Sequence, residues 1–203
     1  GLVDVEAVGP SNDAEAEDSP FHAALDVAPA INSQAQDFGY SRAGGVTRAT
    51  VTPSAGSGIF AGQGAVIDLG ADFDAVREAR AFQHVQMGEA GARLAGGSRT
   101  AVHTLIRNAL FEATRLAETG ERDDDALLTR FDALALAPVV RGEQKLYVSV
   151  HRAADILSVL ALREEFPALD LVLVGVTEGW MVAPQIAAAD VPVELRQAVL
   201  MLV

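Results

Sequence analysis

The fold is decided by three consecutive segments, Leu146–Val150 (LYVSV), Ala153–Phe166 (AADILSVLALREEF) and Leu169–Val176 (LDLVLVGV). The first and third are runs of aliphatic and β-branched residues that favour buried strands, whereas the middle one repeats apolar residues at helical spacing. A helix at Trp180–Ala189 and a strand at Val191–Leu195 follow. This order requires right-handed crossovers and predicts an α/β fold with parallel strands and outer helices. A doubly wound sheet and a barrel both satisfy it.

The chain is predicted to be a single domain in three parts, because 203 residues that are half apolar can bury one sizeable core. Residues 1–44 are interpreted as an irregular excursion rich in Asp, Ser and Pro. Residues 45–145 are expected to hold strands and long helices, and residues 146–203 the regular β/α units.

Four elements are expected in the middle part. In chain order they are strands at Gly45–Pro53 and Gly64–Gly70, a helix capped by Asp72 or Asp74 that runs through Val76 and Phe82, and a helix that starts near Thr100 and stops at Gly120. The last helix is the clearest, because its apolar residues keep the i, i+3, i+4, i+7 rhythm from Val102 to Ala117.

Composition excludes several classes of partner and chemistry. The formal net charge of −13 repels a nucleic acid backbone. Cysteine is absent, so the chain has no disulfide, zinc-thiolate cluster or thiol nucleophile, and cytoplasm and periplasm both stay open. No apolar run is long enough to span a membrane, and the chain is expected to be soluble. Because it starts at Gly1 and ends on an apolar run, we expect it to be a fragment of a longer product.

Two motifs point to cofactors only weakly. The segment Gly56–Ala61 (GSGIFA) matches the glycine-rich dinucleotide fingerprint, but a strand instead of a helix is expected after it. The four histidines are irregularly spaced, and we expect His84 and His103 to lie on helix surfaces. No serine stands in a G-x-S-x-G elbow, so no hydrolase triad is indicated.

A polar mouth is predicted where two parallel strands end. His151 follows the strand at 146–150 and Glu178 follows the next one, and the carboxyl ends of parallel strands meet at one edge of the sheet. The alternative is structural, because a histidine followed by Arg152 and Asp155 is also typical of a capped helix start. Both interpretations remain open at this stage.

Five segments together resemble a known family. They are Ala24–Asn32 (ALDVAPAIN), Arg42–Thr52 (RAGGVTRATVT), Gly62–Leu69 (GQGAVIDL), His151–Ile156 (HRAADI) and Thr177–Ala183 (TEGWMVA). They look like the imidazolonepropionase-like members of the amidohydrolase superfamily. The resemblance implies a segment of a (β/α)8 TIM barrel of the metallo-dependent hydrolase type. It also implies one or two divalent metal ions, usually zinc, and hydrolysis of non-peptide C–N bonds in amide or lactam substrates.

The family's metal ligands are not retained in this chain. The resemblance places the first-strand HxH pair upstream of Gly1 and the eighth-strand Asp beyond Val203. It places the fifth-strand His at Ser149 and the sixth-strand His at Gly175. The catalytic residues therefore stay unknown and no metal site is expected here. The candidate strand-end mouth is Ser149, His151, Arg152, Asp155, Gly175 and Glu178.

Three hypotheses follow. The chain is a degenerate or incomplete amidohydrolase, a possible pseudoenzyme. Alternatively, the full-length product is an enzyme with a one-metal site built from residues outside this chain. A third hypothesis makes it a non-catalytic ligand-binding or scaffolding domain that uses the same mouth. In each case a small molecule is the expected ligand. A partial barrel is also expected to bind the remainder of the barrel or to self-associate, because it exposes sheet edges.

Overall fold

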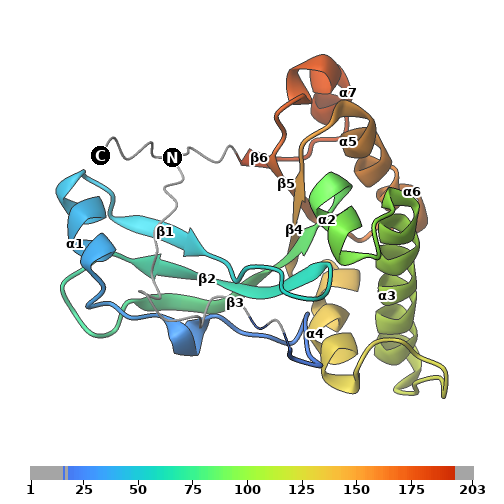
Figure 1. Cartoon of the computed structure of the whole chain (residues 1–203), viewed down its shortest axis with the longest axis horizontal. Helices are drawn as coiled ribbons and strands as arrows, with labels where there is room; N and C mark the ends of the chain where they lie inside the picture. The colour runs from blue at the N-terminus through green and yellow to red at the C-terminus, as the bar shows by residue number, and fades with distance from the viewer. Residues whose placement is uncertain (1–15, 17, 195–203) are drawn as a thin grey trace.

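The computed structural model describes residue 16 and residues 18–194, and within them the chain forms one strongly curved six-stranded sheet (Figure 1). The strands follow sequence order: β1 Arg48–Val51, β2 Phe60–Asp68, β3 Val76–Gln86, β4 Lys145–Val150, β5 Leu171–Gly175 and β6 Val193–Glu194. β1, β2 and β3 pair antiparallel, whereas β3, β4, β5 and β6 pair parallel. The fold is therefore mixed α/β, with a half-barrel sheet.

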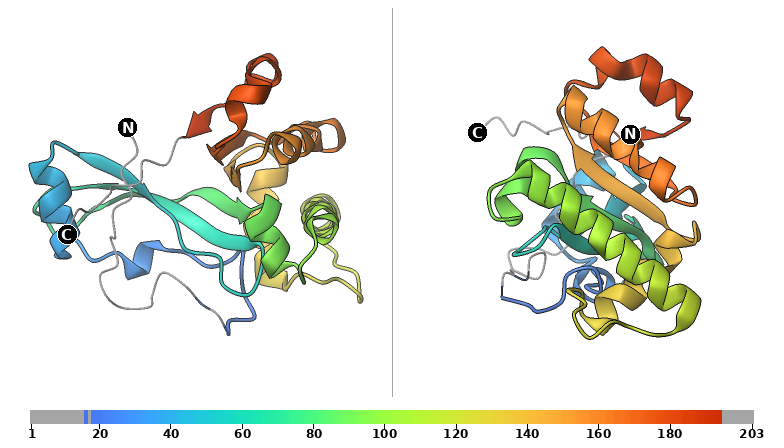
Figure 2. Two further views of the ribbon diagram at one scale, coloured as in Figure 1. Left: turned by 45° about the horizontal axis from the view of Figure 1, so that its top comes forward. Right: turned by 90° about the vertical axis from the view of Figure 1, so that its right-hand side faces the viewer.

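Helices lie before β1 and in the connections from β3 to β4, β4 to β5 and β5 to β6. They are η2 Ala28–Ala30, α1 Gln36–Ala43, α2 Gly88–Leu94, α3 Arg99–Thr119, α4 Arg130–Val140, α5 Ala153–Leu160, α6 Leu162–Glu165, η3 Gly179–Val182 and α7 Ala183–Ala188. Figure 2 shows α3, α4 and α5 together on one side of the parallel part of the sheet. No helix in the described part of the chain is long and apolar enough to cross a membrane.

The two faces of the parallel strands differ in chemistry. On β4, Leu146, Val148 and Val150 point into the main hydrophobic core with residues of α3, α4 and α5. The residues between them, Tyr147 and Ser149, lie on the other face. We call this second face of β3–β5, turned away from the helices, the inner face. A smaller core lies between α1 and the antiparallel strands.

The sheet curls so that its edge strands approach each other. Thr50 of β1 and Glu194 of β6 belong to opposite edges of the sheet, yet the Thr50 hydroxyl donates to the Glu194 carboxylate at 3.4 Å. The inner face is therefore concave, as expected for part of a barrel.

Most predicted elements are confirmed. The strands and helices expected after residue 145 appear as β4, α5 with α6, β5, η3 with α7, and β6. Leu195 and the rest of the apolar end lie outside the described residues. The helix α3 begins after Ser98 and ends at Gly120, whose φ of +73° allows the left-handed cap that a glycine adopts without strain.

Two predictions about the middle part are wrong. The segment through Val76 and Phe82 is strand β3 instead of a helix, because it pairs with β2 on one side and β4 on the other. The Phe82 ring also stacks on Tyr147 at a centroid distance of 4.1 Å. Secondly, the sheet is only partly parallel: residues 69–75 connect β2 to β3 directly, without a crossover helix, so these strands run antiparallel.

Candidate functional site

The ends of β4 and β5 bring three of the predicted mouth residues together. The register places Val150 beside Gly175, and the next residue of β4's connection is His151. The His151 ring lies against Gly175, so that a Cβ on Gly175 would be 2.5 Å from the ring's Cε1. Its Nδ1 is 2.9 Å from the Thr177 hydroxyl. The Glu178 backbone N–H donates to the His151 carbonyl at 2.8 Å.

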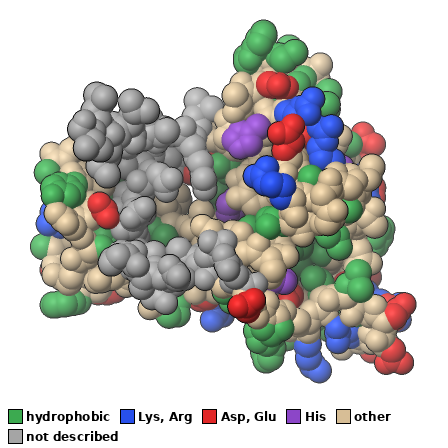
Figure 3. Space-filling model, viewed as in Figure 1, with side chains coloured by type: hydrophobic (Ala, Val, Ile, Leu, Met, Phe, Trp, Pro, Cys, Tyr) green, Lys and Arg blue, Asp and Glu red, His purple; other side chains and the backbone are tan. Residues whose placement is uncertain are grey.

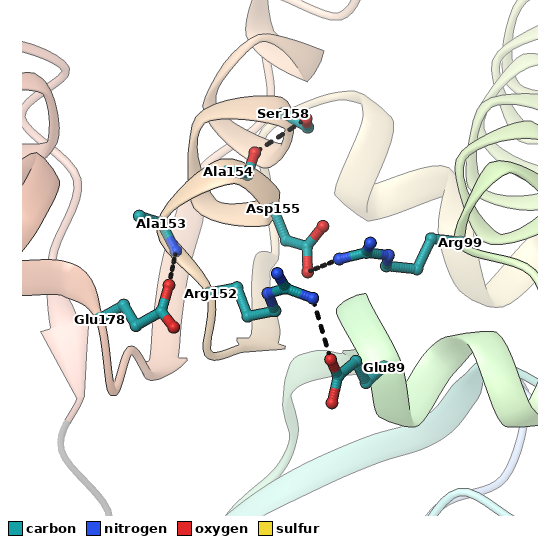
Figure 4. A network of polar contacts seen from close by, with 8 residues as sticks. All are labelled: Glu89, Arg99, Arg152, Ala153, Ala154, Asp155, Ser158 and Glu178. Carbon is teal, nitrogen blue, oxygen red and sulfur yellow. Dashed lines mark hydrogen bonds and ion pairs between the residues drawn. The ribbon is translucent and has the colours of Figure 1, made fainter.

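The acidic and basic residues of this mouth are engaged in holding helices in place (Figure 4). The Glu178 carboxylate accepts a hydrogen bond of 2.9 Å from the Ala153 N–H, which satisfies a free donor at the start of α5. Arg152 pairs with Glu89 of α2 at 3.1 Å. These contacts agree with the alternative interpretation of the sequence, in which the charged residues after His151 belong to a capped helix start.

Asp155 completes this network from within α5. Its side chain is buried, and its carboxylate lies 3.5 Å from the guanidinium of Arg99 in α3. Arg152 and Asp155 therefore connect α5 to two different helices. In Figure 3, acidic, basic and histidine side chains gather in the upper right, where α2 and α5 lie in Figure 1.

Ser149 takes part in a different arrangement on the inner face. Its hydroxyl oxygen is 2.8 Å from Nε2 of His84, which lies on the neighbouring strand β3. The other ring nitrogen of His84, Nδ1, is 2.8 Å from the hydroxyl of Thr52, just after β1. We call these three residues the hydroxyl–imidazole chain. Ser149 is 6% and His84 2% exposed, whereas Thr52 is half-buried.

The geometry indicates how the protons of this chain are placed. The Thr52 hydroxyl can donate to Nδ1 of His84 at 2.8 Å or to the Pro53 carbonyl at 3.3 Å. The shorter contact is the better hydrogen bond, so we place the Thr52 proton toward Nδ1. The ring then carries its own proton on Nε2 and donates it to the Ser149 oxygen. In this state His84 is an acceptor toward Thr52.

A cavity of about 360 Å³ opens beside the hydroxyl–imidazole chain. It lies between β1 with the residues after it, the end of β3, and α2. Polar and charged residues in its wall include Thr50, Thr52, His84, Gln86 and Arg93. Arg93 is exposed and forms no ion pair with any residue that the structure describes. The volume is within the range of small-molecule sites.

The described residues do not fit a zinc centre of their own. Zinc requires several imidazole, carboxylate or thiolate donors converging at one point. At the two positions where the sequence resemblance would place histidine ligands, Ser149 is hydrogen-bonded to His84, and the space over Gly175 is filled by the His151 ring. Within residue 16 and residues 18–194, no group of three or more His, Asp or Glu side chains could hold a metal ion.

The prediction for one histidine, His103, is confirmed, whereas the prediction for His84 is wrong, and His84 is also the site residue that the sequence did not reveal. His103 lies on α3 as expected, where burial and then the nearby Arg107 lower its pKa below 6.5. His84, expected on a helix surface, is buried in β3. The contact between His84 and Ser149 depends on the pairing of β3 with β4, and the sequence pattern did not predict β3 as a strand.

Comparison with known proteins identifies a related fold. No family model matches the chain. A search of curated proteins finds no match either. Among solved structures, the chain is similar to the crystal structure of an amidohydrolase from Thermotoga maritima MSB8, with a TM-score of 0.79 and 21% identity. The similarity covers 96% of this chain and 54% of that protein, so the chain spans about half its length. At this identity the likeness shows a shared fold.

Proposed function

We propose that this chain is a segment of a (β/α)8 barrel of the amidohydrolase type, from the imidazolonepropionase-like group. In this proposal the inner face and the strand-end mouth face a small molecule with a non-peptide C–N bond, such as an amide or a lactam. The observation that carries the proposal is the likeness to an amidohydrolase over 96% of the chain. The five sequence segments that resemble this family, in family order, add to it.

We further propose that the segment is degenerate or incomplete as a metal-dependent hydrolase. The two family ligand positions inside the chain hold a hydroxyl group and a glycine, and neighbouring side chains occupy the space around both. Glu178 and Asp155, the two carboxylates of the mouth, are engaged with α5 and α3. A catalytic ion would need its ligands from residues other than these.

A second candidate function is ligand binding without hydrolysis. It is favoured by the cavity beside Thr52 and His84, which has polar walls and lies at the carboxyl end of β3, where ligands of parallel α/β sheets bind. This function requires no metal ion. It would use the same half-barrel as a rigid support.

The test combines metal content with activity and binding. We expect the purified chain to contain no stoichiometric zinc and to show no zinc-dependent hydrolysis of a panel of small amides and lactams. Members of the panel should nevertheless raise the melting temperature in the presence of a chelator, because a ligand that binds the folded state stabilises it. Stoichiometric zinc with hydrolysis would contradict the degenerate assignment. No stabilisation by any panel member, together with no hydrolysis, would contradict a small-molecule site.

A matched pair of variants locates the binding. His151→Ala removes a mouth side chain that contacts Thr177 and Gly175, and should weaken the stabilisation by the ligand. Arg163→Ala removes a side chain at the far end of the sheet, where it donates to the Ala189 carbonyl, and should leave the ligand-induced shift unchanged. If the ligand raised the melting temperature of both variants equally, the ligand would bind elsewhere than at the mouth.

A further inference from the structure

Of the three members of the hydroxyl–imidazole chain, one hydroxyl is accessible from the cavity. Thr52 lines the cavity wall and is half-buried, so a molecule in the cavity can reach its oxygen. Ser149 is nearly fully buried and lies on the opposite side of the His84 ring. The order is therefore an accessible hydroxyl, an imidazole, and a buried hydroxyl behind it.

This order matches the general requirements for an activated oxygen nucleophile. A hydroxyl is weakly nucleophilic until an adjacent base accepts its proton, and the base must itself be oriented by a third group. The Thr52 oxygen is 2.8 Å from His84 Nδ1, and Nε2 of the same ring is 2.8 Å from Ser149. Both distances are within the range for proton transfer in a hydrogen bond.

The same cavity holds a cationic group that could stabilise a developing negative charge. Arg93 of α2 lines the wall and is unpaired among the described residues. An attack on a carbonyl group creates an oxyanion, and a nearby positive charge in a partly enclosed site lowers the energy of that state. The nucleophile, the base and this cation come from three different elements.

We propose that this cavity is a metal-independent acyl-transfer site, in which Thr52 is the nucleophile, His84 the general base and Ser149 a positioning residue, and that it takes small carboxylic esters. The proposal does not depend on the C–N bond hydrolysis proposed above. The third group here is a hydroxyl, which orients the ring but stabilises a protonated imidazole less than a carboxylate would. We therefore expect slow turnover and a persistent acyl-enzyme.

The reaction is balanced without any further reactant except water. The Thr52 oxygen bonds to the ester carbonyl carbon while its proton moves to Nδ1 of His84. Collapse of the tetrahedral intermediate breaks the bond to the alkoxide, which leaves with the proton from Nδ1. Water then attacks the acyl-Thr52 ester, passing a proton through His84 to the threonine oxygen. The net reaction is ester plus water to carboxylic acid plus alcohol.

The experiment is acylation of the whole chain followed by peptide mapping. The protein is incubated, with a chelator present, with p-nitrophenyl acetate and separately with a fluorophosphonate that reacts with activated hydroxyls. We expect one covalent adduct per chain, located on Thr52. His84→Gln should lower the labelling rate at least about 100-fold, the low end for loss of a general base. Thr52→Val should abolish the adduct, and Thr52→Ser should retain it.

Three further variants separate chemistry from folding. Thr104→Val removes an exposed threonine hydroxyl of α3, outside the cavity, and should label at the wild-type rate. Ser149→Ala should slow labelling, whereas Ser149→Thr should restore it, because only the hydroxyl is required to orient the ring. Each variant is first shown to have a wild-type melting profile. An adduct on a surface lysine or on Ser149, or no adduct on the folded protein, would overturn the proposal.

Discussion

Substitution of Asp132 tests which contacts hold the segment around His22 and Ala24 against helix α4. The side chain is 2% exposed and lies in the first turn of α4. One carboxylate oxygen accepts hydrogen bonds from the backbone N–H groups of His22 and Ala24, at 2.9 and 2.8 Å. The other accepts from the Thr129 hydroxyl at 2.7 Å, and Thr129 accepts in turn from the Asp132 N–H. The carboxylate therefore connects two segments 108 to 110 residues apart.

The expected cost of Asp132→Ala follows from these contacts. Hydrogen bonds to a charged acceptor contribute about 1.5–3 kcal/mol each, so three of them set an upper bound of about 4.5–9 kcal/mol. Water can reach part of the freed backbone groups, and contributions at neighbouring groups do not add fully. We expect a loss of about 3–5 kcal/mol, a large part of the stability of an ordinary domain. Asp132→Asn retains one acceptor oxygen and should lose roughly half as much.

Urea unfolding followed by circular dichroism measures these differences. Asp124→Ala is the matched control, because Asp124 is exposed and should change the free energy of unfolding by less than about 0.5 kcal/mol. Proteolysis offers a second readout, since cleavage near His22 should accelerate in Asp132→Ala. A loss below about 1 kcal/mol for Asp132→Ala would refute the reasoning, because the three contacts would then contribute no more than an ordinary surface cap.

Three other outcomes are expected. Gly64→Ala places a Cβ against the Phe82 ring and should cost about 1–3 kcal/mol of stability, whereas Gly39→Ala meets open space and should not. Equal melting temperatures of the two variants would contradict this. The pKa of His103 is lowered by burial, so its contribution to stability is complete above about pH 6.5 and is lost as the pH falls below that value. In His103→Gln, the free energy of urea unfolding should therefore depend less on pH between about pH 7.5 and pH 5.5. An unchanged dependence would contradict this prediction. Burial raises the pKa of Tyr147 above 10.0, so stability should decline as the pH rises past about 10. Tyr147→Phe should remove this decline and also the latest phase of the alkaline absorbance titration. A titration that the substitution leaves unaltered would contradict the raised pKa of Tyr147.

The regular half of the fold could be predicted because its information is local. The strands β4 and β5 are compact, mostly apolar runs, and α5 between them repeats its apolar residues at a helical period. The strand β3 could not be predicted in this way. Its first half is exposed and charged, and its second half is a strand because β2 and β4 bond to it from both sides. The pairing with β4 depends on residues more than 60 positions away in the sequence.

The candidate site, like the fold, could be predicted only in its regular β/α part. His151 and Glu178 could be expected at one edge because parallel strands end together, and the Glu178 backbone N–H donates to the His151 carbonyl. The hydroxyl–imidazole chain was not found, for a physical reason. Thr52 follows an antiparallel strand and His84 lies in the strand that the sequence suggested was a helix, so neither belongs to the regular β/α pattern. The pairing of β3 with β4 brings His84 to Ser149, and Thr52 reaches His84 from the end of β1, on the far side of β2.

The two faces of β4 explain why stability and function can be separated in this fold. Leu146, Val148 and Val150 contact the helices and belong to the main core, so their substitution acts on folding. Ser149 alternates with them and faces the concave side, where it contacts His84 and not the helices. A polar residue buried on the inner face is a cost to folding unless it is hydrogen-bonded, and Ser149 has such a partner. The polar residues of the inner face can therefore be substituted with little effect on the main core, while the other face continues to hold the curved sheet against the helices.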